Sequence, residues 1–156
     1  MIRLATLADA RAIAELHVAS WRAAYVGILP PAYLEGLSVE EREAGWRSRL
    51  AAGRQVWLAR DGFAAAGSSR DDDASAGDAE IYAIHVHPAS WRRGVGRDLL
   101  AAACAALAPA PITLWVIEGN ARARAFYQAA GFRLDGGRKE KRFGDTLVCE
   151  VRYRLQ

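Results

Sequence analysis

A strand, a glycine-containing turn and a helix follow one another between residues 79 and 107, and this unit limits the fold more than any other feature. The segment "AEIYAIHVH" (79–87) alternates in the manner of a β-strand and ends at Pro88. The stretch "SWRRGVGRDLL" (90–100) then brings two glycines and an apolar run that predicts a helix to about Leu107. A strand feeding directly into a helix is typical of domains in which helices pack on a sheet.

The rest of the chain mixes hairpins with helical segments. One α/β (α+β) domain over residues 1–156 is therefore expected, with a mixed central sheet of about seven strands and helices on both faces. The polar, low-complexity stretch 68–78 is predicted to be a mobile loop. The charged run 138–142, "RKEKR", is predicted to be a solvated turn between strands. Further strands are expected at 2–6, 54–60, 63–67, 109–117, 132–138 and 146–155, and further helices at 8–24, 32–37, 39–52 and 120–130.

Composition excludes several classes of protein. With 156 residues, 52% of them hydrophobic, the chain is long enough to bury one substantial core. No run of 18 apolar residues is present, and the N-terminus lacks the layout of a signal peptide, so neither a membrane span nor export is expected. Cys104 and Cys149 are interpreted as buried thiols in a reducing compartment, which favours a cytoplasmic location. A net charge of +3 is too small to argue for nucleic acid as a partner.

The turn before the helix at 95–107 has the properties of an anion site. The first N–H groups of a helix lack internal partners, and the helix dipole places partial positive charge there. Gly94 and Gly96 allow a ligand to approach the backbone, while Arg92, Arg93 and Arg97 add full charges. A phosphate is the natural ligand. A Walker loop is excluded because Arg97-Asp98 follows the second glycine, and a dinucleotide fingerprint is excluded by Leu99.

Three stretches together resemble one family. "VHPASWRRGVGRDLL" (86–100) is similar to motif A of the GNAT acetyltransferase superfamily, and "EGNARARAFYQAAGF" (118–132) to its second signature. "SWRAAYVGILPPAYLEGL" (20–37) resembles the helix–loop–helix entry of a common bacterial branch. The resemblance covers essentially the whole chain. One position departs from the pattern, because Trp91 stands where motif A has Gln or Arg, and Arg92 or Arg93 is expected to supply that contact.

The resemblance implies acetyl-CoA as co-substrate. Its pyrophosphate would lie on the turn formed by Arg92, Arg93, Gly94, Val95, Gly96 and Arg97. Its pantetheine arm would pair with the strand before the turn, at Ile84, His85 and Val86, because the sheet of this family splays open between strands 79–87 and 111–117. Asn120 would contact the cofactor or a bound water.

Two residues are candidates for the chemistry. Acetyl transfer to an amine requires removal of a proton from the amine and protonation of the leaving thiolate. By resemblance Tyr127 is the acid, and Glu80, on the strand before motif A, is the candidate base, with a water relay as the alternative. His85 and His87 could relay a proton. No ligand spacing points to a metal.

The acceptor is expected to be a primary amine on a small molecule or peptide. Trp21 and Tyr25, on the first helix, are the predicted substrate-binding residues. Because no nucleophilic Cys or Ser constellation is visible, direct transfer in a ternary complex is expected. The resemblance also leaves a homodimer open. A non-catalytic domain that binds or senses acyl-CoA is the alternative function.

Overall fold

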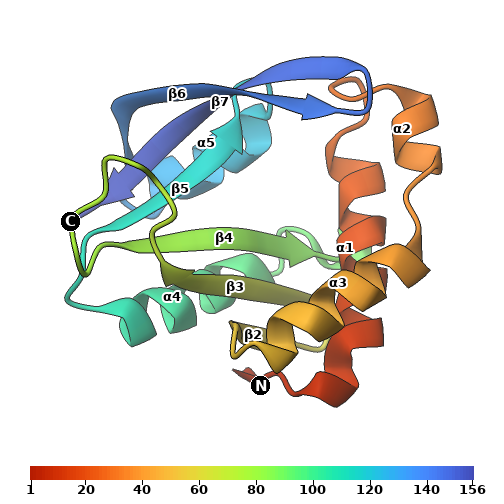
Figure 1. Cartoon of the computed structure of the whole chain (residues 1–156), viewed down its shortest axis with the longest axis horizontal. Coiled ribbons are helices and arrows are strands. Elements are labelled where there is room, and N and C mark those ends of the chain that lie inside the picture. Colours follow the sequence, from red (N-terminus) through yellow and green to blue (C-terminus); the bar gives the residue numbers. More distant parts are fainter.

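The computed structural model describes residues 1–156 as a seven-stranded sheet in the order β1-β2-β3-β4-β5-β7-β6 (Figure 1). Only β4 and β5 pair in parallel, so the predicted mixed sheet is confirmed. None of the helices is long and apolar enough to cross a membrane. The strands are β1 Arg3–Leu4, β2 Gln55–Ala59, β3 Gly62–Ser68, β4 Ala79–Val86, β5 Ile112–Ile117, β6 Arg133–Phe143 and β7 Thr146–Leu155. The α-helices are α1 Ala10–Ala24, α2 Pro31–Glu35, α3 Val39–Ala51, α4 Val95–Leu107 and α5 Ala121–Ala129.

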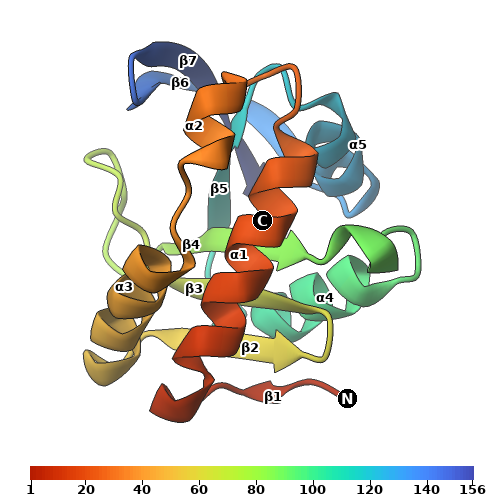
Figure 2. The ribbon, with the colours of Figure 1, turned by 90° about the vertical axis from the view of Figure 1, so that its right-hand side faces the viewer.

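Helices cover both faces of the sheet, as predicted (Figure 2). Strand β3 explains how, because successive side chains of a strand point to opposite faces. Ala64 and Ala66 join the core cluster that contains Leu99 of α4, whereas Phe63 joins the cluster that contains Ile13 of α1. A strand that is apolar on both faces can hold a helix layer on each side.

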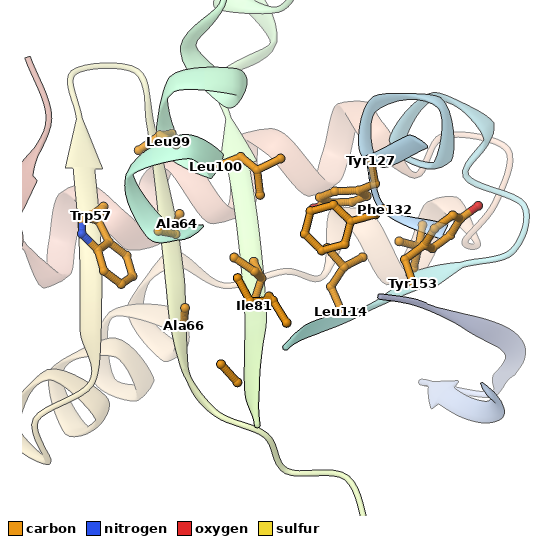
Figure 3. Packing of buried hydrophobic residues seen from close by; sticks show 14 of the residues in the cluster. Trp57, Ala64, Ala66, Ile81, Leu99, Leu100, Leu114, Tyr127, Phe132 and Tyr153 are labelled. Atoms are coloured by element: carbon orange, nitrogen blue, oxygen red, sulfur yellow. The ribbon is translucent and has the colours of Figure 1, made fainter. Parts of the chain in front are cut away.

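The sheet splays open in its middle. Strands β4 and β5 pair only at Ala79 with Ile112 and at Glu80 with Thr113, and beyond that point they diverge. Strand β5 continues along β7 as far as Ile117, so the halves of the sheet separate into two wings (Figure 1). Figure 3 shows Ile81 of β4 on one wing, with Leu114 and Tyr127 on the other. The splay implied by the family resemblance is present.

Two helix starts beside the gap have local causes. The side chain of Asn120 accepts a hydrogen bond from the N–H of Ala123 at 3.1 Å, which caps α5. Gly94 precedes α4 with φ 86°, a left-handed conformation that favours glycine. Both caps place the first turn of a helix at an edge of the splay.

The charged run 138–142 is a strand, not the predicted turn. These residues belong to β6 and pair with residues 147–151 of β7, while Gly144 and Asp145 make the connection. The alternation of charges suits an exposed strand, since Lys139 lies opposite Glu150 in the ladder.

The loop predicted to be mobile is held against the sheet. Asp71 accepts a hydrogen bond from Nε1 of Trp115 at 2.9 Å, and its carboxylate lies 3.1 Å from the guanidinium of Arg152. Arg152 also contacts Asp73 at 2.7 Å and Asp135 at 2.8 Å. The loop's polar composition therefore serves a set of long-range ion pairs, which no local pattern reveals.

Candidate active site

The turn before α4 presents unpaired backbone donors. Arg92 has φ 62° and Gly94 has φ 86°, so the chain folds back sharply just before the helix. The N–H groups from Arg92 to Arg97 donate to no backbone carbonyl or side chain of the protein, and Asp98 is the first residue of the turn whose N–H is bonded, at 3.0 Å to Gly94. Such a row of donors at a helix N-terminus suits a phosphate group.

The edge of β4 toward the gap is partly open. The N–H of His87 bonds to the carbonyl of Asp61 at 2.7 Å, on the side of β3. Because backbone direction alternates along an antiparallel strand, His85 also faces β3, while Ile84 and Val86 direct their N–H and C=O groups into the gap. Of the three residues expected to pair with an extended ligand, Ile84 and the N–H of Val86 are oriented to do so, and the backbone of His85 is not.

Trp91 has a defined place in this site. Its indole N–H donates to the carbonyl of Val86 at 2.9 Å, and the guanidinium of Arg122 lies 3.6 Å from the centre of its ring. Trp91 thus ties the end of β4 to the first turn of α5. Sequence reasoning named Trp91 only as a departure from motif A and missed Arg122, whose one signal was its place two residues after Asn120.

A cavity of about 620 Å³ occupies the splay. It brings together most of the residues predicted from the sequence and leaves three of them outside its lining. The lining includes Trp21, Tyr25, Ile84, His85, Val86, Arg92, Gly94, Gly96, Arg97, Asn120 and Tyr127, whereas Glu80, Arg93 and Val95 are absent from it.

Two tyrosines, Tyr25 and Tyr127, line the cavity. Tyr127 reaches in from α5, and burial raises its pKa well above the ordinary value for a phenol. Burial also raises the pKa of Tyr25 to about 12, with the charge of Glu150 acting in the same direction and the amide of Asn120 opposing it. Both hydroxyls are therefore protonated at neutral pH, and Tyr127 is available as a proton donor.

The ring of His85 is held by α1. Its Nε2 accepts from the indole of Trp21 at 3.2 Å, and its Nδ1 lies 3.3 Å from the hydroxyl of Ser20. The imidazole also stacks on His17 at 5.1 Å. Burial lowers the pKa of His85 to about 4, so the ring is neutral at pH 7 and both nitrogens are engaged. This geometry does not support the predicted proton relay through His85. The ring of His87 instead accepts from the N–H of Ala89, at 3.2 Å.

Glu80 is placed differently from the sequence prediction. Its carboxylate is buried, accepting from the backbone N–H of Arg70 at 2.9 Å and from its guanidinium at 2.7 Å. The docked loop that carries Arg70 covers Glu80, which was not foreseeable from strand alternation. An amine in the cavity would not reach this carboxylate, so the geometry does not support Glu80 as the base.

We expect Glu80→Gln to leave kcat within about twofold, because the residue lacks access to the cavity, and to lower the free energy of unfolding by about 1 kcal/mol through its weakened contacts with Arg70. Steady-state kinetics and urea unfolding of the same preparation would measure both. A large loss of kcat with unchanged stability would return Glu80 to the mechanism.

A different carboxylate lines the cavity. Glu150, on β7 opposite Ile117, is 8% exposed and makes no hydrogen bond through its side chain within the protein. Sequence reasoning missed it because Glu150 alternates with Arg152 and Arg154 along β7, a pattern that is typical of a solvated strand face.

Three features together are typical of a class of acyl-transferring enzymes: a splayed mixed sheet, a phosphate-type turn at its edge and a buried phenol in the gap. The chain belongs to the acetyltransferase (GNAT) family, whose model matches residues 11–132. It is therefore an acyltransferase of the N-acetyltransferase type.

Two relatives named as N-acetyltransferases agree with this assignment, and a solved structure shares the fold. An uncharacterized N-acetyltransferase of Bacillus subtilis, YuaI, is 39% identical over 137 residues, covering 82% of this chain and 77% of its own. A probable N-acetyltransferase of Mycobacterium tuberculosis, Rv2775, is 31% identical over 160 residues, covering 99% and 92%. The structure of YncA, a putative acetyltransferase from Salmonella typhimurium solved with acetyl-CoA, shares the fold with a TM-score of 0.70 at 22% identity, covering 100% and 92%.

Proposed function

We propose that the protein transfers an acetyl group from acetyl-CoA to a primary amine, directly, within a ternary complex. One observation carries the proposal: the unpaired donors of the turn, the open edge of β4 and the buried hydroxyl of Tyr127 border one cavity. A binding-only domain would need the turn and the edge but not a buried phenol between them.

The residues of the site fit acetyl-CoA. The N–H groups from Arg92 to Arg97 suit its pyrophosphate, and the backbone groups of Ile84 and the N–H of Val86, which face the gap, suit the amides of its pantetheine arm. When bound, acetyl-CoA supplies an acetyl group activated as a thioester. Family neighbours of this fold include a structure that holds it, which supports the assignment.

The proton balance assigns a role to Tyr127. A C–N bond forms as the C–S bond breaks, so the nitrogen of an ammonium group loses two protons and the sulfur gains one. Tyr127 donates the proton that the sulfur needs, and a proton from the nitrogen restores it, leaving one proton for solvent. A backbone N–H of β4 that faces the gap stabilises the negative charge that develops on the acetyl oxygen.

The acceptor enters beside α1. Trp21 and Tyr25 line the cavity on that side, with their rings 4.7 Å apart in an edge-on arrangement. Their placement supports the predicted role in binding the acceptor.

A screen of primary amines that follows release of the CoA thiol tests the proposal. We expect thiol release that depends on both acetyl-CoA and the amine, and acetyl-CoA binding detectable by calorimetry. Absence of acetyl-CoA binding would refute the assignment. Tight binding without thiol release for any amine would favour the alternative, a domain that only binds acyl-CoA.

A further inference from the structure

We propose that Glu150 receives the ammonium group of the acceptor and thereby restricts the enzyme to amines that are cations on an apolar or aromatic skeleton. This inference rests on the proposed function and extends it from a reaction to a substrate class.

Glu150 is a buried carboxylate without a sufficient partner in the protein. It is 8% exposed, and its side chain makes no hydrogen bond to any other residue. The nearest cation is Nζ of Lys139, 4.0 Å away at the limit of an ion pair, and Lys139 is itself stacked over the ring of Trp115 at 4.1 Å. The carboxylate of Glu150 opens into the cavity and is shielded from water elsewhere, so a cation in the cavity would gain a strong, weakly screened partner.

The other cations near this end of the sheet do not pair with Glu150. Arg152, two residues along the same face of β7, is engaged by Asp71, Asp73 and Asp135. Lys141 lines the cavity but lies over the ring of Phe143, with its Nζ 5.3 Å from the centroid. Arg122, which also lines the cavity, lies over the ring of Trp91 at 3.6 Å. A ligand in the cavity is therefore a further source of positive charge for Glu150.

The position of Glu150 suits the nitrogen that is acetylated. Glu150 lines the same cavity as Tyr25, Asn120 and Tyr127, and its negative charge raises the pKa of Tyr25. An ammonium group at Glu150 would therefore lie in the cavity that holds the two tyrosines.

The surroundings of Glu150 define the rest of the acceptor. Trp21, Ile117 and Phe143 line the same cavity and belong to one apolar cluster, in which the rings of Trp21 and Phe143 lie 5.5 Å apart. Apolar walls around one carboxylate suit a primary ammonium carried by a hydrocarbon or aromatic body.

The test compares a cationic with a neutral nucleophile of similar size. Binding of phenethylamine and other arylalkylamines, and of benzhydrazide, to the CoA-loaded protein is measured by calorimetry at neutral pH. For Glu150→Gln we expect the arylalkylamines to bind roughly tenfold more weakly or worse, with benzhydrazide little changed. Glu150→Asp should restore part of the loss. The matched control is Glu140→Gln, which makes the same charge change at an exposed position on the neighbouring strand.

Each outcome decides the proposal. Equal weakening of arylalkylamine and benzhydrazide binding in Glu150→Gln would overturn it, because a merely structural role does not distinguish a charged from a neutral ligand. Equal weakening of arylalkylamine binding in Glu150→Gln and Glu140→Gln would also overturn it. Failure of the wild-type protein to bind any arylalkylamine would overturn it as well. Thiol release is measured separately. Charge-selective binding without turnover would refute the proposed function and leave the role of Glu150 standing. Turnover with an unchanged acceptor KM in Glu150→Gln would support the proposed function and refute the role of Glu150.

Discussion

Replacing Tyr127 by phenylalanine is expected to lower kcat by about 100-fold while the affinity for acetyl-CoA stays nearly unchanged. The substitution removes only the hydroxyl that donates the proton to sulfur. The ring keeps its packing against Phe126 and Phe132, at 5.1 and 5.9 Å between centroids, so the cavity should retain its shape. Steady-state thiol release gives kcat, and calorimetry gives the acetyl-CoA affinity.

The pH dependence of kcat is a second test of the role of Tyr127. Because burial raises the pKa of Tyr127, its acidic form persists through the range where a free phenol, with a pKa of about 10, begins to ionise. Any loss of rate caused by Tyr127 should therefore begin only above that range. Tyr33→Phe, outside the cavity lining, is the matched control. An undiminished kcat in Tyr127→Phe would remove this residue from the mechanism.

Replacing Arg152 by alanine is expected to lower the free energy of unfolding by about 3 kcal/mol, because Asp71 and Asp73 lose their ion pair and Asp135 keeps only Arg154. Arg152 is 8% exposed, and its guanidinium joins the docked loop, through Asp71 and Asp73, to Asp135 of β6. Urea unfolding measures the loss. Hydrogen exchange at residues 71–78 should rise more than elsewhere, because the loop then keeps only the bonds from Arg70 to Glu80 and from Trp115 to Asp71 as its side-chain ties to the sheet.

Arg11 is the control that separates the effect of burial from the effect of the number of ion pairs. It also contacts three carboxylates, those of Glu15, Glu40 and Glu43, but it is half exposed on the surface. Arg11→Ala should destabilise the protein much less than Arg152→Ala, since exposed pairs are screened by water and salt. An equal loss in the two variants would show that burial of Arg152 is not the cause.

Much of the candidate site could be predicted because its parts are local in sequence. The turn at 92–97 needs only a strand end, glycine at 94 and a following apolar helix, all within one short stretch. Asn120 and Tyr127 lie on a single helix, with the residue types and spacing of a family signature. The candidates Trp21 and Tyr25 likewise come from one helix whose amphipathic pattern is plain.

The site residues that the structure places differently from expectation depend on contacts with residues distant in sequence. Glu80 looked like a catalytic carboxylate because its own strand is apolar, but a loop beginning ten residues earlier brings Arg70 over it. His85 looked like a free relay, but Trp21, 64 residues away, donates to its ring. Glu150 was not singled out from the sequence, and only the pairing of β7 with β5 places it on the wall of the cavity.

The sequence by itself determined the order of strands and helices, the phosphate-type turn and the family, because hydrophobic periodicity and turn chemistry act over a few residues. The tertiary structure decided where β4 and β5 part and which face of β7 meets the cavity. It also decided that the indole of Trp91 bonds to Val86 and packs against Arg122. Strand register and long-range ion pairs arise from packing of the whole chain, so a carboxylate's neighbours, and with them its chemistry, are fixed only when the fold is complete.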